Sequence, residues 1–401
     1  MPLNAYISKQ TVWAADAQNP PPNFIELASG KMLFACSPGT SHLSTDARLA
    51  IKTATSEAAA NAGTFSAETV IEPYVTATGS VNPPRGTYTN TGMYFGGGAY
   101  FTQVKEGPNA GRVWMMYTSG IDLPLHDRAW NNWQVWLRYT DNPDDSVITW
   151  SSRIEMTNLW DGGYGIQDNI KGFGPLTPML EVPGTNGQEF VLVSLGFDST
   201  EKYEYSKLLG TTTGPDGTWS VRSVVQTPGG ASATYSPSEP VQGIIHDSRG
   251  NAKLAIGVNY WPNAVYWKTS TDWGYTWEQG TGAGTTIAST ATGPPAFVEC
   301  QDGSIVCIYR KLGGVEPMWA RRSLDDGATW SDAWELDGTG RMRYGNWQVL
   351  KSGRIGLCYG IETTVMSSTE ASIYWRTFTT PGLTGTQHGA GRARAKNSRL
   401  R

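Results

Sequence analysis

The sequence predicts an all-β fold, a six-bladed β-propeller of four-stranded antiparallel blades with a disordered basic tail at its C-terminal end. Three observations lead to this prediction. An octapeptide occurs twice, a pair of apolar stretches around a glycine turn recurs along the chain, and the composition is rich in glycine (47 residues) and proline (23 residues). Many short strands joined by turns require such a composition.

The octapeptide Ser-x-Asp-x-Gly-x-x-Trp occupies residues 270–277 and residues 323–330, which begin 53 residues apart. Asp and Ser side chains bind backbone N–H groups of a tight turn, Gly adopts a positive φ, and Trp packs the turn onto its own sheet. A repeat at this period indicates one supersecondary unit that is used several times. We therefore expect structural roles for Asp272, Gly274, Trp277, Asp325, Gly327 and Trp330.

A second element recurs six times as an apolar stretch, a polar turn and another apolar stretch. Its copies are residues 24–34, 100–117, 179–195, 241–258, 297–307 and 347–357. Five copies precede an aromatic turn, either one of the two octapeptides or a weaker version at residues 55–66, 141–151 and 214–220. In the sixth unit we expect a strand from the N-terminus, near residues 6–12, to close the ring. Six blades of four short strands fit this count.

No long stretch of the 401 residues has a helical period of 3.6 residues. The Ala-rich segment 56–62 is short and lacks an apolar stripe, so we interpret it as a loop. We assign residues 1–382 to the propeller and residues 383–401 to a flexible, Gly-rich basic tail.

The net charge of −4 argues against nucleic-acid binding by the main body. The tail is basic and is either a solvated C-terminus or an electrostatic anchor for an assembly or a nucleic acid. The four cysteines, Cys36, Cys300, Cys307 and Cys358, have no metal-ligand spacing, and we expect buried free thiols. We predict no metal and no cofactor.

The first residues show no basic region followed by an apolar core, and no apolar run reaches transmembrane length. We therefore expect synthesis in the cytoplasm without a signal peptide and no membrane partner. The sequence leaves open whether the protein is associated with a virion. It also leaves open whether the protein forms a homo-oligomer.

The two octapeptides and the six hairpins resemble the Asp-box (BNR) repeats of the sialidase, or neuraminidase, superfamily over residues 6–380. The resemblance implies a six-bladed propeller and a carbohydrate ligand, although Asp boxes also occur in propellers that are not sialidases. Sialidases are retaining glycosidases with a Tyr nucleophile. A carboxylate beside the phenol takes its proton, and a second acidic group serves the leaving oxygen and the water.

By this resemblance, three residues take the catalytic positions. Tyr344 precedes the last hairpin, as the family's nucleophile does, and Glu239 lies in a Ser-Glu-Pro segment similar to the family's Asn-Glu-Pro segment. The two are 105 residues apart, about two repeats, which places them at corresponding points of their blades. Asp46 precedes the strand that leads to the first aromatic turn and takes the acid/base position.

The family holds the substrate carboxylate with three arginines, and this chain departs from that pattern. Arg310 matches one position, whereas Asn23 and Asn259 stand at the other two. The departure argues against sialic acid itself as the ligand. Four arginines could substitute for the missing ones from loops: Arg85, Arg128, Arg341 and Arg343. A loop that contains Trp130 is a further candidate contact with the sugar.

Two functions remain open at this point. One is a sialidase-like retaining glycoside hydrolase that acts on a surface glycan or polysaccharide. The other is a non-catalytic carbohydrate-binding or structural propeller of a phage virion, for receptor binding, tail assembly or capsid decoration. A lyase on a propeller is a weaker third. The enzyme hypothesis requires Tyr344, Glu239, Asp46 and Arg310 to converge around one axial pocket.

Overall fold

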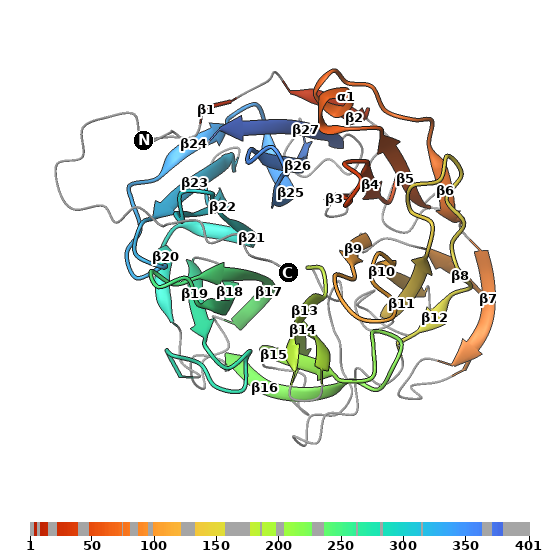
Figure 1. Cartoon of the computed structure of the whole chain (residues 1–401), viewed down its shortest axis with the longest axis horizontal. Helices are drawn as coiled ribbons and strands as arrows, with labels where there is room; N and C mark the ends of the chain where they lie inside the picture. Colours follow the sequence, from red (N-terminus) through yellow and green to blue (C-terminus); the bar gives the residue numbers. More distant parts are fainter. Residues whose placement is uncertain are drawn as a thin grey trace.

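The computed structural model describes residues 4–5, 9–14, 22–38, 48–73, 75–80, 87–94, 99–121, 133–156, 177–184, 187–197, 204–226, 236–261, 264–280, 284–313, 316–362 and 371–379. Their strands form six antiparallel sheets arranged as blades around a central axis, and the first strand of each blade lies nearest the axis (Figure 1). The fold predicted from the sequence is confirmed.

The first three blades follow the chain in order. Blade 1 contains β3 (Asn23–Glu26), β4 (Met32–Cys36), β5 (Leu49–Ala54) and β6 (Thr69–Glu72). Blade 2 contains β9 (Ala99–Gln103), β10 (Val113–Ile121), β11 (Trp133–Thr140) and β12 (Ile154–Glu155), and the hairpin of β7 (Val75–Ser80) and β8 (Thr87–Tyr94) extends it beyond the end of β10. Blade 3 contains β13 (Leu180–Gly184), β14 (Gly187–Phe197), β15 (Glu204–Thr211) and β16 (Ser220–Gln226).

The other three blades complete the ring. Blade 4 contains β17 (Ser236–His246), β18 (Ala252–Trp261), β19 (Ala264–Ser270) and β20 (Thr285–Ala288). Blade 5 contains β21 (Ala291–Glu299), β22 (Ile305–Lys311), β23 (Met318–Ser323) and β24 (Trp334–Asp337). Blade 6 contains β25 (Arg341–Val349), β26 (Ile355–Glu362) and β27 (Ala371–Thr379).

Two N-terminal strands close the ring, as the sequence predicts. Both β1 (Asn4–Ala5) and β2 (Gln10–Trp13) pair antiparallel with β27. The six predicted hairpins are also confirmed, because in every blade the first strand pairs antiparallel with the second. The five aromatic turns all lie between the third and fourth strands of blades 1–5.

The core of the described residues lies between blades rather than within them. Six apolar clusters each combine side chains of two neighbouring blades, and the cluster between blades 6 and 1 joins Phe24 and Phe34 to Trp375. Each blade thus buries both faces, which explains why strands such as β4 are apolar without alternation.

Polar side chains of the first strands tie four of the blades to the blade before them. In each case, a carboxylate or amide oxygen accepts a hydrogen bond from a backbone N–H in or next to the first hairpin turn of the preceding blade. These bonds are Glu26 Oε2 with Lys351 N (2.7 Å), Gln103 Oε1 with Ala28 N (3.1 Å), Glu181 Oε2 with Lys105 N (2.7 Å) and Glu299 Oε2 with His246 N (3.0 Å). They fix the relative height of neighbouring blades at the end of the axis where these turns lie.

The two octapeptide turns have the predicted hydrogen bonds. Ser270 Oγ accepts from Gly274 N (2.7 Å), and Asp272 Oδ1 accepts from Thr276 N (2.8 Å). The second copy repeats both bonds at 2.8 Å through Ser323 and Asp325. The residues before and at each glycine have positive φ, 57° and 92° in the first copy and 60° and 87° in the second.

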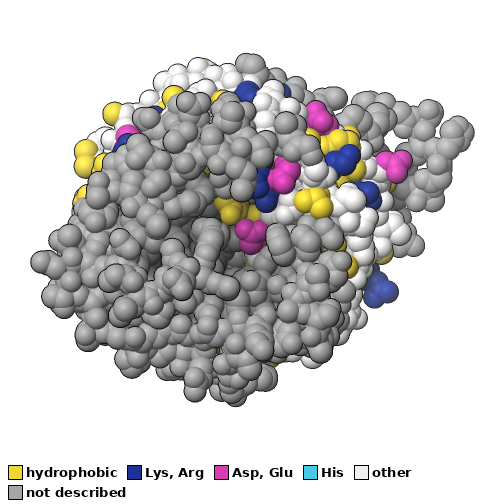
Figure 2. Space-filling model, turned by 180° about the vertical axis from the view of Figure 1, so that it is seen from behind, with side chains coloured by type: hydrophobic (Ala, Val, Ile, Leu, Met, Phe, Trp, Pro, Cys, Tyr) yellow, Lys and Arg dark blue, Asp and Glu magenta, His cyan; other side chains and the backbone are white. Residues whose placement is uncertain are grey.

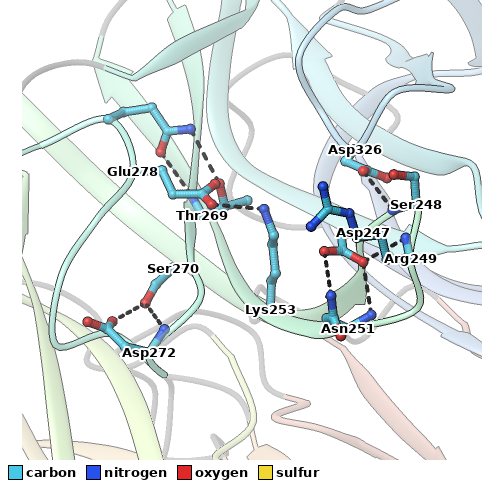
Figure 3. Close-up of polar contacts among 11 residues, drawn as sticks. Asp247, Ser248, Arg249, Asn251, Lys253, Thr269, Ser270, Asp272, Glu278 and Asp326 are labelled. Atoms are coloured by element: carbon cyan, nitrogen blue, oxygen red, sulfur yellow. Dashed lines mark hydrogen bonds and ion pairs between the residues drawn. The ribbon is translucent and has the colours of Figure 1, made fainter.

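Beyond the sheet to which it belongs, each octapeptide turn also contacts the preceding blade. Trp277 Nε1 donates to Ser223 Oγ in blade 3 (3.0 Å), and Trp330 packs edge-on against Trp267 of blade 4. Asp326 Oδ2 accepts from Ser248 N in the first turn of blade 4 (3.0 Å), as Figure 3 shows. Each octapeptide turn therefore also joins its blade to the preceding one.

The loop interpretation of residues 56–62 was wrong, because α1 (Glu57–Asn61) lies there. Ser56 Oγ caps the helix by accepting from Ala59 N (3.2 Å), and Asn61 Oδ1 accepts from Trp375 Nε1 of blade 6 (2.9 Å). The helix is only about one turn long and buries one residue, Ala60, so its sequence shows no apolar stripe. The prediction of free buried thiols is confirmed for all four cysteines. Among the described residues, no helix has the length and apolarity that crossing a membrane requires.

A glycine substitution tests the packing between blades. A Cβ at Gly327 would lie 2.1 Å from Trp267 Nε1, at a φ of +87°. Gly250 has a similar φ of +88°, and a Cβ added there would have no neighbour within 4 Å, so Gly250→Ala measures the backbone cost alone. We expect Gly250→Ala to lower the free energy of unfolding by about 1 kcal/mol and Gly327→Ala by about 3 kcal/mol in urea titrations. Equal losses would contradict tight packing of this turn on blade 4.

Candidate active site

β-Bulges interrupt the first strands of blades 4, 5 and 6 at the end of the axis opposite to the first hairpin turns. The pairing register shifts between Ser238 and Val241 in β17, between Thr292 and Ala296 in β21, and between Met342 and Gly345 in β25. A bulge leaves residues unpaired and changes the direction of their side chains. Glu239 and Tyr344 lie within two of these bulges, and Glu239 has a φ of 47°, which is rare for a residue with a side chain.

The two bulged residues, from blades 4 and 6, meet although they lie 105 residues apart. Tyr344 Oη donates a hydrogen bond to Glu239 Oε1 (3.2 Å), and Asn259 Nδ2 donates to Glu239 Oε2 (3.1 Å). Burial raises the pKa of the Glu239 carboxyl, and the charge of Arg310 together with the two hydrogen bonds opposes that rise. The arrangement therefore couples a phenol to a carboxylate whose proton affinity is above normal.

Arg310 lies at the end of β22, between this pair and a second carboxylate. Its Nε atom is 3.3 Å from Glu316 Oε2, and Nη1 donates to Met342 O (3.4 Å). Arg341 Nε donates to the same Glu316 oxygen (2.6 Å). Burial lowers the pKa of Arg310, and the nearby charge of Arg341 lowers it further. A Cβ at Gly293 would lie 2.9 Å from Arg310 Nη2, so the bulge of β21 gives the guanidinium its space.

Tyr100 is a further residue of this region that the sequence analysis did not single out. It lies in β9 of blade 2, it is 2% exposed, and its hydroxyl has no hydrogen-bond partner among the described residues. Burial raises its pKa well above the usual value, and the charges of Tyr344 and Glu239 add to the effect. The sequence did offer a signal for Tyr100. It is the first residue of the predicted hairpin at residues 100–117, and the first strand of each blade lies nearest the axis.

The remaining predicted site residues fall into two groups. Asn23 lies in β3, 1% exposed, and its amide atoms have no hydrogen-bond partner within the described part of the chain. Arg343 lies in the bulge of β25, with its side chain outside the described set. Four other predicted residues lie outside the described residues: Asp46, Arg85, Arg128 and Trp130. Of the four residues expected to converge, the structure therefore brings together Tyr344, Glu239 and Arg310 and does not describe Asp46.

A cavity of about 220 Å³ lies among the first strands, and Tyr344, Glu239 and Arg310 are not part of its lining. First strands of all six blades line it, and Val241 and Gly345 of its wall closely follow Glu239 and Tyr344 in sequence. Much of the rest of the lining is apolar or aromatic: Phe24, Phe101, Leu180, Phe297 and Trp347. On the face drawn in Figure 2, acidic and basic side chains of described residues lie next to one another near the middle of the molecule. Across the described ranges, no three His, Cys, Asp or Glu side chains gather as they would around a metal ion.

Comparison with solved structures gives the same architecture. A Dyadobacter fermentans protein of unknown function aligns with a TM-score of 0.64 at 12% identity, over 94% of this chain and 98% of that one. The intramolecular trans-sialidase of Ruminococcus gnavus aligns with a TM-score of 0.61 at 13% identity, over 93% and 97%. A sialidase of Trypanosoma rangeli, solved as a covalent intermediate with 2,3-difluorosialic acid, aligns with a TM-score of 0.61 at 12% identity, over 94% and 59%.

No protein-family model matches the chain, and no curated protein matches it in sequence. At identities this low, the structural likeness shows the fold, which is the six-bladed propeller that sialidases have.

The raised pKa of Glu239 gives a pH prediction. In the folded protein, this carboxyl binds its proton more tightly than the value of 4.5 expected for the unfolded chain. Its contribution to stability is therefore full below pH 4.5 and is lost as the pH rises through the folded pKa. We expect the unfolding free energy of the wild type, relative to Glu239→Gln, to fall as the pH rises above 4.5. Urea titrations at a series of pH values measure this, and a difference that grows with pH would contradict it.

Proposed function

We propose that this protein is a sialidase-like retaining glycoside hydrolase acting on a surface glycan or polysaccharide. The observation that carries the proposal is the hydrogen bond from Tyr344 Oη of blade 6 to Glu239 Oε1 of blade 4 (3.2 Å). A phenol is a poor nucleophile near neutral pH, and an adjacent carboxylate makes it competent by accepting its proton. A propeller needs no such pair for its stability, because its core lies between the blades.

In the first step, Tyr344 Oη attacks the anomeric carbon of the sugar while its proton passes to Glu239. The bond between that carbon and the leaving oxygen breaks, and an acid protonates the leaving oxygen. In the second step, water attacks the same carbon and gives its proton to the acid/base group, while the tyrosyl–sugar bond breaks and the phenol recovers its proton from Glu239. We assign the acid/base role to Asp46 by resemblance to the family.

The environment of Glu239 suits a base. Burial raises its pKa, which makes the carboxylate a stronger base, while the charge of Arg310 and the hydrogen bond from Asn259 favour its ionised form. The likeness to sialidases, one of them solved as a covalent intermediate, supports the same chemistry.

A second candidate is a propeller that binds or displays carbohydrate without cleaving it, such as a structural or receptor-binding protein of a phage virion. Asn23 and Asn259 favour it, because the resemblance to sialidases implies arginines at these positions. In this case the partners would be a glycan and the other subunits of the particle or of a homo-oligomer, with nucleic acid bound only through the basic tail.

Substitution of the nucleophile distinguishes the two candidates. We expect Tyr344→Phe to lower the turnover of the best substrate about 10³-fold or more, measured with a panel of 4-methylumbelliferyl glycosides that includes an α-sialoside and neutral hexosides. Tyr359→Phe is the matched control. Tyr359 lies in β26, and its hydroxyl donates to Asp337 Oδ2 (2.9 Å), so its loss should lower stability and leave turnover intact.

The binding function gains if the wild type and Tyr344→Phe leave every glycoside of the panel uncleaved while a glycan array records binding. Cleavage by Tyr344→Phe at the wild-type rate would remove Tyr344 from the mechanism.

A further inference from the structure

Two arginines beside the Tyr344–Glu239 pair share one internal carboxylate. Glu316 Oε2 lies 2.6 Å from Arg341 Nε and 3.3 Å from Arg310 Nε. The three side chains are 14–19% exposed, so water screens their charges only in part. Two arginines next to each other in a partly buried site form a favourable binding position for a carboxylate. In this protein, Glu316 supplies that carboxylate.

The backbone holds Glu316 in place at a conformational cost. Its φ is 52°, a left-handed conformation that non-glycine residues rarely adopt. Met342 N donates to Glu316 O (3.2 Å), which fastens this residue to the strand that carries Tyr344. Strained residues of this kind cluster at functional sites, where surrounding contacts maintain them.

The charges of these groups offset one another. Arg310 and Arg341 are positive, Glu316 neutralises one of these charges, and Glu239 neutralises the other when it is ionised. In that state the described part of the site, with Asn259 as a neutral donor to Glu239, presents no net positive charge to a ligand. An anionic sugar would have to displace Glu316 from two ion pairs before it gained the same contacts itself.

We propose that Glu316 is the specificity-determining residue of this site. It fills the anion-binding position between Arg310 and Arg341, so that the ligand is a sugar bound there through uncharged hydroxyl or amide groups. This inference rests on the proposed function for the identity of the ligand as a carbohydrate. The occupancy of the arginine pair by Glu316 stands on the geometry alone.

Chemical rescue tests the occupancy without any sugar. We expect Glu316→Ala to unfold at a lower temperature than the wild type and to recover with sodium acetate, because acetate restores a carboxylate between the two arginines. Acetamide, which has nearly the same shape without the charge, should have no effect at equal ionic strength. The control is Glu189→Ala, which removes the partner of Arg222 at a buried ion pair in blade 3. Equal rescue of both variants, or rescue by acetamide, would overturn the proposal.

A pair of sugars that differ only in charge tests the specificity. N-acetylneuraminic acid and its methyl ester are titrated by calorimetry into the wild type and into Glu316→Gln, which keeps the side-chain shape and removes its charge. We expect the preference for the free acid over the ester to increase about tenfold in the variant. An unchanged or reduced preference would overturn the proposal.

The failure of this inference is distinguishable from that of the proposed function. If neither sugar binds to either protein and no glycoside of the panel is bound or cleaved, the carbohydrate function is wrong. The acetate experiment then still decides whether Glu316 fills an anion site. If the sugars bind and Glu316→Gln does not alter the preference, the specificity role is wrong while the carbohydrate function stands.

Discussion

Each blade of this protein buries both of its faces against neighbours, and this is the constraint on which the rest of the structure depends. The apolar clusters lie between blades, so no blade is complete until the next one packs on it, and the last junction forms when β1 and β2 pair with β27. Two kinds of hydrogen bond then fix the height of a blade relative to its neighbour. One comes from the octapeptide turns, and the other joins a first strand to the first hairpin turn of the preceding blade. A closed ring of this kind has an axis onto which the first strands necessarily face.

The site arises where the first strands depart from regular pairing. Bulges in β17, β21 and β25 put Glu239 and Tyr344 and the space for Arg310 at one end of the axis. Regular strands would direct these side chains into the clusters between blades, where a carboxylate or a guanidinium is costly to bury. The positive φ of Glu239 and of Glu316 is a local cost that the surrounding ring offsets.

The fold was predictable from the sequence because its signals are local. The glycine turns, the apolar pairs of strands and the Ser-x-Asp-x-Gly-x-x-Trp turns each lie within about 20 consecutive residues, and their repetition along the chain indicates blades. The meeting of Glu239 and Tyr344 was predictable from the resemblance to sialidases, supported by their separation of about two repeats. The ion pairs of Glu316 with Arg310 and Arg341 were not predictable, because they depend on how residues of blades 5 and 6 come together in space. The helix α1 was missed because its stabilising contacts, to blade 6, lie more than 300 residues away.

Arg310 links the selection of a ligand to the chemistry of the pair. The same guanidinium lies near Glu239, whose pKa it lowers, and near Glu316, which neutralises part of its charge. If an anionic ligand displaced Glu316, it would take over that neutralising role, and the pKa of Glu239 would change little. If Glu316 were lost without a replacement, the charge of Arg310 would act more strongly on Glu239 and lower its pKa. In the proposed mechanism, Glu316 therefore limits the effect of Arg310 on the base as well as filling the anion position.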